Sequence, residues 1–168
     1  SGAPSPGFSP PGPDADLADL ERSMASLRVF GDDLDPDELT GLLGRLPSES
    51  RRKGDVYRVT RRGRLREADT GYWSYSAQDR APGALDLQID QIFRDLTEDI
   101  GVWRAVTSRF SCDLYCGLFL QDWSGWTILT PATLGAIAAR GVELNLQVYG
   151  VIGSGSDQGA YVGNGSDY

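Results

Sequence analysis

The sequence contains no histidine, so the residues best able to take part in catalysis or binding are its carboxylates, its arginines and its two cysteines. Without an imidazole, Ser-His-Asp and Cys-His nucleophilic sites are excluded, and so are most zinc sites. Phosphate-binding loops of the Gly-x-x-x-x-Gly-Lys and Gly-x-Gly-x-x-Gly types are absent as well. We therefore expect no catalytic residue and no cofactor, which leaves metal binding, thiol chemistry and partner binding to consider.

Five carboxylates lie close together in the sequence, at Asp32, Asp33, Asp35, Asp37 and Glu38. Such a cluster can bind a hard cation such as Ca²⁺ or Mg²⁺, but its order differs from that of an EF-hand loop. A structural role explains two members: Asp35 has the position of a helix N-cap before Pro36, and Glu38 completes a capping box. We therefore predict a strand, an acidic turn and a helix here, and no metal site.

The two cysteines, Cys112 and Cys116, lie in a segment whose even positions are all apolar. This alternation predicts a strand over Phe110–Leu120, on which four residues span about 13 Å. A disulfide requires Cα atoms within about 7 Å of each other. We therefore predict two free thiols on the buried face of the strand, where cysteine behaves as a small apolar residue.

The strongest charge asymmetry lies in segment 51–66, where half of the residues are basic. They are Arg51, Arg52, Lys53, Arg58, Arg61, Arg62, Arg64 and Arg66. Together with the nearby aromatic residues Tyr72 and Trp73, they form a candidate surface for phosphates or for an acidic protein or peptide. In the alternative interpretation, these side chains are an ordinary solvated surface and pair with the chain's own excess carboxylates.

The overall charge narrows the class of partner. A formal net charge of −8 at pH 7 repels duplex nucleic acid and anionic lipid. The sequence has no run of 18 apolar residues and no signal segment at its start. We therefore predict a cytoplasmic protein that binds an acidic protein or peptide, with no membrane or duplex nucleic acid as partner; the oligomeric state is not predicted.

Hydrophobic periodicity predicts the elements that position these groups. One helix is predicted over Leu85–Trp103, a strand over Trp126–Leu129, a helix capped by Thr130 and ended by Gly141, and a strand over Val142–Val148.

The basic segment itself is predicted as a hairpin. Val56–Thr60 has the composition of a strand, Arg61–Arg64 forms the tip, and Gly71–Ser76 is the returning strand.

The predicted order is β-α-β-β-α-β-β-α-β, which favours an α+β fold. We expect a mostly antiparallel sheet with helices on one face, a variant of the ferredoxin-like arrangement. Residues 25–150 form this single domain. Residues 1–24 are predicted as a flexible tail with a short amphipathic helix over Asp14–Ser23, and 151–168 as a Gly/Ser-rich tail.

The segment Ser26–Glu38, with Gly-Asp-Asp-Leu-Asp-Pro at a strand–helix junction, resembles the opening of a bacterial family of unknown function called DUF4279. Arg52–Gly54, Thr70–Ser74 and Leu144–Tyr149 are similar to later landmarks of that family. The resemblance covers residues 25–150 and implies a small soluble bacterial module. It supplies no catalytic residues, because the family has no assigned activity.

Three functions remain open. Size, acidity and missing catalytic groups favour a non-enzymatic protein- or peptide-binding module, of an immunity or regulatory type. In a second hypothesis the domain is a leader-like carrier that presents the segment Gly153–Tyr168 to a modifying enzyme. In a third, a hydrolase or isomerase works with Asp, Glu and Arg alone. No two carboxylates are identified as a catalytic pair, so we favour the first.

Overall fold

The computed structural model describes residues 20–59, 63–121 and 125–150. Five strands form one sheet in the order β2-β5-β1-β6-β7. All neighbours are antiparallel except β6 and β7, which run parallel. Their bounds are Leu20–Gly31 (β1), Glu49–Arg51 (β2), Gly71–Ser76 (β5), Ser111–Leu120 (β6) and Glu143–Tyr149 (β7). A short separate ribbon pairs Val56–Arg58 (β3) with Leu65–Glu67 (β4).

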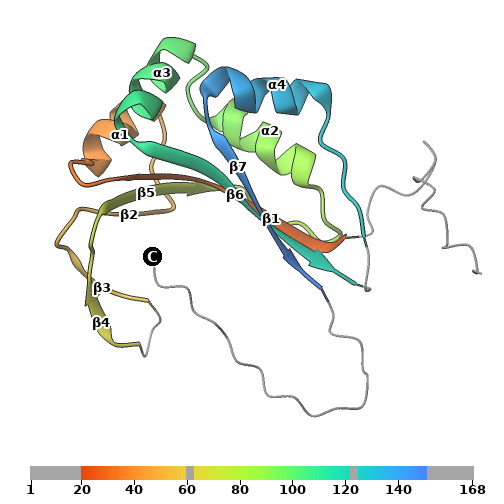
Figure 1. The fold of residues 1–168 in the computed structure, drawn as a ribbon, viewed down its shortest axis with the longest axis horizontal. Helices are drawn as coiled ribbons and strands as arrows, with labels where there is room; N and C mark the ends of the chain where they lie inside the picture. Colours follow the sequence, from red (N-terminus) through yellow and green to blue (C-terminus); the bar gives the residue numbers. More distant parts are fainter. Residues whose placement is uncertain (1–19, 60–62, 122–124, 151–168) are drawn as a thin grey trace, which may run out of the picture.

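The described helices all lie on one face of the sheet, as Figure 1 shows. They are Pro36–Leu43 (α1), Leu85–Asp95 (α2), Ile100–Arg109 (α3) and Pro131–Arg140 (α4). The predicted α+β class with a mostly antiparallel sheet and helices on one face is therefore confirmed. The order of elements is not the predicted one: the described chain runs β-α-β-β-β-β-α-α-β-α-β.

The core forms where the two central strands, β1 and β6, present their apolar faces to the helices. Leu27 is the register partner of Leu114, and Val29 is the partner of Cys112; all four side chains are buried. Burying a side chain such as Leu114 contributes about 1.5–3 kcal/mol. Both cysteines are free and buried as predicted, and burial raises the pKa of each thiol to about 12.

The start of α1 follows its local sequence signals. Asp35 is the N-cap, and its carboxylate accepts a hydrogen bond of 2.9 Å from the backbone N–H of Asp37. Gly44 ends the helix with a φ of 80°, which a glycine adopts without steric cost. The predicted capping role of Glu38 is not observed, because its carboxylate accepts from Arg109 of α3 instead, at 2.6 Å.

The short helix predicted over Asp14–Ser23 is wrong for the residues that the structure describes. Leu20 already belongs to β1, so the sheet extends before the predicted domain boundary at residue 25. A bulge between Leu20 and Arg22 shifts the strand's alternation. Leu20 and Ser23 are consequently both buried, three residues apart, whereas Met24, which with Leu20 gave the apolar spacing of the predicted helix, is only half-buried. The predicted flexible tail over residues 1–24 is likewise wrong for residues 20–24, which belong to β1. Residues 1–19, with the remainder of this helix, and the predicted tail 151–168 lie outside the described residues.

The predicted single helix over Leu85–Trp103 is two helices, α2 and α3. The break is set by Asp99, which is the N-cap of α3 and accepts from the backbone N–H of Gly101 at 2.7 Å. The indole N–H of Trp103 donates to the carbonyl of Thr97 in the connecting segment. An apolar stripe continues through the break, since Leu96 is buried and Ile100 is half-buried, so periodicity alone did not reveal it.

The strand predicted over Trp126–Leu129 is absent; this part of the chain has no regular secondary structure. The reason is that β1 and β7 occupy both edges of β6, so no strand position is left beside it. The segment leads directly into α4, whose predicted cap at Thr130 and end at Gly141 are confirmed. α4 thus serves as the crossover between the parallel strands β6 and β7.

Gly71–Ser76 was predicted as the returning strand of the basic hairpin, and this pairing is also wrong. The partner of β3 is β4, whereas β5 lies in the main sheet between β1 and β2. Core packing explains why β5 pairs with β1 and not with β3: Trp73 on β5 is fully buried under the helices and is the register partner of Val29 on β1. The β3–β4 ribbon consequently projects on the side of the sheet away from the helices (Figure 1).

Candidate functional site

The helix-free face of the sheet and the β3–β4 ribbon enclose a cavity of about 790 Å³, which we call the open-face groove. Side chains of a strand alternate between faces, so residues between the core positions point into this groove. The lining includes two cations, aromatic residues, an amide and one carboxylate: Arg28, Arg51, Tyr57, Tyr72, Tyr115, Gln147 and Asp69.

Arg28 is held in the centre of the open-face groove by its register partner on β6. Its Nε and Nη2 donate to the two carboxylate oxygens of Asp113 at 2.8 and 2.5 Å. These hydrogen bonds raise the pKa of Arg28 above its already high usual value. The guanidinium carbon lies 4.5 Å from the ring centre of Tyr115. Arg28 is therefore fixed beside an aromatic surface, with its charge paired to that of Asp113.

Arg51 is the second cation of the groove and connects the sheet to the ribbon. Its guanidinium carbon lies 4.3 Å from the ring centres of both Tyr57 on β3 and Tyr72 on β5. One nitrogen, Nη1, donates to Glu49 at 2.5 Å. Stacking on two rings leaves the other N–H groups of a guanidinium directed outward from its edge. Arg51 and Tyr72 are the predicted binding residues that the structure brings together here.

The next two basic residues bind the chain's own acidic turn. Arg52 pairs with Asp35 at 2.7 Å and with Asp37 at 2.8 Å, and Lys53 forms an ion pair with Asp32. The hydrogen bond from Lys53 lowers the pKa of Asp32, and the backbone N–H of Asp37 lowers that of Asp35. For Arg52 and Lys53 the alternative interpretation, pairing with internal carboxylates, describes the structure, and it also describes the ion pair of Arg51 with Glu49.

The other predicted residues are spread over different places. Arg58 donates to the carbonyl of Gly63 within the ribbon, and Arg64 and Arg66 are exposed beside it. Trp73 cannot contact a partner, because it is fully buried and its indole N–H donates to Thr40 of α1. The predicted residues Arg61 and Arg62 lie outside the described residues.

Sequence reasoning missed the contribution of β6 and β7. The hydroxyl of Tyr115 donates to Gln147 at 2.5 Å and lies 3.0 Å from that of Tyr149, whose ring stacks on Phe119 at 4.6 Å. Burial raises the pKa of Tyr115 to about 12. Asn145 donates to Asp113 at 3.2 Å. The available signal was the set of polar positions that alternate with the core positions in both strands, because such positions share the opposite face of the sheet.

No group of three or more potential metal ligands occurs among the described residues. In the acidic turn, the carboxylates are engaged by protein cations: Arg109 binds Glu38, and Arg52 and Lys53 bind the aspartates. These contacts give the cluster a structural explanation.

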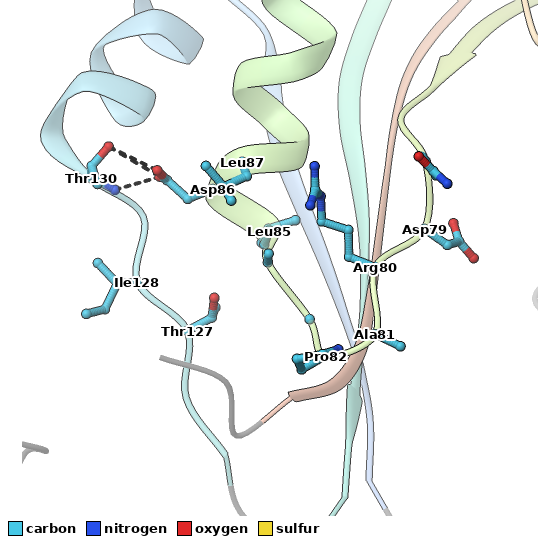
Figure 2. A pocket seen from close by; sticks show the side chains of 13 residues that line it. Asp79, Arg80, Ala81, Pro82, Leu85, Asp86, Leu87, Thr127, Ile128 and Thr130 are labelled. Carbon is cyan, nitrogen blue, oxygen red and sulfur yellow. Dashed lines mark hydrogen bonds between the residues drawn. The ribbon is translucent and has the colours of Figure 1, made fainter. Parts of the chain in front are cut away.

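A second cavity, of about 770 Å³, lies where the segment before α2 passes the segment before α4 (Figure 2). Leu87 and Ile128 line it and are half exposed. Of its charged side chains, Asp86 accepts from the backbone N–H and the hydroxyl of Thr130, and Asp79 pairs with Arg22. Its carboxylates therefore have structural partners, and we place the candidate site in the open-face groove.

The fold and the groove define an α+β domain with one helical face and one open polar-aromatic face. The model of the family described as Domain of unknown function (DUF4279) matches residues 21–151. The chain belongs to this family. No curated protein and no solved structure matches the chain. In the part of the chain that the structure describes, no helix is long and apolar enough to cross a membrane.

Proposed function

We propose that this protein is a non-enzymatic protein- or peptide-binding module that binds an acidic segment of its partner in the open-face groove. The observation that carries the proposal is the position of Arg51 between the rings of Tyr57 and Tyr72, on two different parts of the fold. A stacked guanidinium is pre-oriented and loses little conformational freedom when it binds a carboxylate.

The size and composition of the groove support a peptide ligand. Its volume of about 790 Å³ is within the usual range for binding sites, and its lining combines the two arginines with tyrosines, amides and one carboxylate, Asp69. Aromatic residues and arginine are the types that contribute most binding energy in protein interfaces. The groove is thus suited to a few residues that combine carboxylates with apolar or aromatic groups.

A binding role also agrees with the state of the carboxylate beside Arg28. Asp113 accepts from Arg28 and from Asn145, so its oxygens are committed to structural hydrogen bonds. A general base must instead be free to take a proton from the substrate. A cytoplasmic location fits the proposal, since the chain's two cysteines are free thiols.

The test is a selection from a random peptide library displayed on phage, with the full chain as bait. Enriched peptides should be rich in Asp and Glu, and synthetic copies should bind less tightly as salt is added. Arg51→Gln removes charge-assisted hydrogen bonds, each about 1.5–3 kcal/mol, so affinity should fall by at least about tenfold. The control, Arg104→Gln, changes an exposed arginine on the helical side.

Equal binding of the selected peptides by the wild type, Arg51→Gln and Arg104→Gln would contradict the proposal. Enrichment of basic or uncharged peptides would contradict the predicted acidity of the partner.

A further inference from the structure

The edge of the sheet at β7 exposes apolar side chains that the described part of the chain leaves uncovered. β7 is the last strand in the sheet order, and no strand of the described residues pairs with its outer edge. Leu146 is 47% exposed and Val148 is 58% exposed. Their register partners on β6, Cys116 and Leu118, are buried on the helical face. The apolar layer of the sheet therefore continues to β7, but at β7 the helices no longer cover it completely.

The helix beside this edge has an exposed apolar side of its own. α4 contacts α2, α3 and β7, and residues Pro131–Ala139 carry no charge. Ala136 and Arg140 line a small cavity with α2, so they mark the side of α4 that faces α2. Leu134 and Ala138 lie on the opposite side by helical periodicity, and both are exposed, Leu134 by 47%.

We propose that a second copy of this chain binds here, through antiparallel pairing of β7 with β7 and contact of α4 with α4 across a two-fold axis. Such a dimer continues the sheet from five strands to ten and leaves the helices of both copies on one face. The proposal goes beyond the binding function of the open-face groove and does not depend on it; the two surfaces adjoin at β7, since Asn145, Leu146 and Gln147 also line the groove.

The sequence of β7 is complementary to itself in this arrangement. With Leu146 on the two-fold axis, Leu144 of one copy lies opposite Val148 of the other, and Asn145 lies opposite Gln147. Cross-strand partners share a face of the sheet, so the apolar side chains continue one layer and the amides another. A dimer of this symmetry uses the same patch on both copies.

The charge and edge chemistry of β7 are compatible with a second copy as the partner. The one charged residue of β7 is Glu143, and this register places it opposite Tyr149 rather than opposite another carboxylate. β7 also has neither proline nor lysine, the residues that commonly protect a free edge from pairing. The two copies each carry a net charge of −8, so added salt should screen their repulsion and strengthen the dimer.

Sedimentation velocity over a range of concentrations tests the proposal. The wild type should show twice the 18.2 kDa mass of the chain at high concentration. Leu146→Lys and Leu134→Glu place charges in the two halves of the interface, so each should raise the dissociation constant at least about tenfold. Leu46→Lys is the matched control, because Leu46 is 78% exposed and lies next to β2 at the opposite edge.

Hydrogen exchange locates the interface independently, since β7 amides should exchange more slowly at high protein concentration in the wild type and in Leu46→Lys. A wild type that stays monomeric at every concentration would overturn the inference, whether or not the chain's own terminal segments are what cover the β7 edge. A dimer unchanged by Leu146→Lys and Leu134→Glu would overturn it as well. The groove variant Arg51→Gln should dimerise normally, which separates this test from that of the proposed function.

Discussion

Arg28 and Asp113 are register partners on neighbouring strands and form a bidentate ion pair on the helix-free face of the sheet. Their side chains are only 25% and 14% exposed. The pair fixes the position of the central cation of the open-face groove. Since Asn145 also donates to Asp113, three strands meet at this one carboxylate.

Asp113→Ala should destabilise the fold and loosen the groove. The substitution leaves a half-buried guanidinium without its partner, and the expected loss is about 1–3 kcal/mol in the free energy of unfolding. Urea unfolding followed by circular dichroism measures it. Asp79→Ala is the control, because the Arg22–Asp79 pair is exposed, and it should cost less than about 1 kcal/mol. Equal losses for the two variants would show that the Arg28–Asp113 pair has no special role.

The acidic turn should make the fold sensitive to acid. The folded-state pKa of Asp35 lies below its usual 3.8, mainly through the hydrogen bond from the backbone N–H of Asp37. Its charge therefore stabilises the fold fully above pH 3.8, and this contribution disappears as the pH falls through the lower folded-state value. Asp35→Asn keeps a capping oxygen but does not titrate, so its stability should fall less between neutral and acid pH.

Urea midpoints of the wild type and Asp35→Asn at several pH values check this prediction. Asp35→Ala removes the cap and should have a lower midpoint at neutral pH with an unchanged slope. Identical pH profiles for the wild type and Asp35→Asn would contradict the role assigned to this carboxylate.

The parts of the fold that could be predicted from the sequence are those determined by residues close to one another in the chain. Asp35 and Pro36 start α1, Thr130 starts α4, and the alternation around Cys112 identifies β6. The break after α2 was missed because Asp99 caps α3 inside a continuous apolar stripe, where periodicity outweighs a single capping residue.

Strand pairing and the candidate site were harder to predict, because they depend on residues far apart in the chain. β5 follows the ribbon in sequence, but the burial of Trp73 places it between β1 and β2. Arg28 and Tyr115 belong to the site only because β1 and β6 are paired. The basic segment was correctly identified as unusual in charge, yet Arg52 and Lys53 are engaged by the acidic turn, which no local pattern indicates.

The two thiols should be unreactive in the folded protein. With a pKa of about 12, Cys112 and Cys116 are almost entirely protonated at neutral pH, and both are buried. A thiolate is the species that reacts with disulfide reagents. Labelling with Ellman's reagent should therefore be at least about 100-fold slower in native protein than in urea, from the thiolate fraction alone. Rapid labelling of both thiols under native conditions would contradict their placement on the core face of β6.

The contact of Tyr57 with Arg51 should hold the ribbon against the sheet. Tyr57→Ser removes one of the two rings that flank the guanidinium, a cation–π contact worth about 0.5–1 kcal/mol at an exposed site. Backbone N–H groups of the ribbon should then exchange about two- to fivefold faster with solvent, and so should that of the adjoining Gly54, which donates to the carbonyl of Ala68. Hydrogen exchange followed by mass spectrometry measures this change.

Val56→Ser is the control, because Val56 is a neighbouring exposed residue of the same strand. The exchange rates of this variant should match those of the wild type. If both variants accelerate exchange equally, the contact between Arg51 and Tyr57 does not hold the ribbon against the sheet.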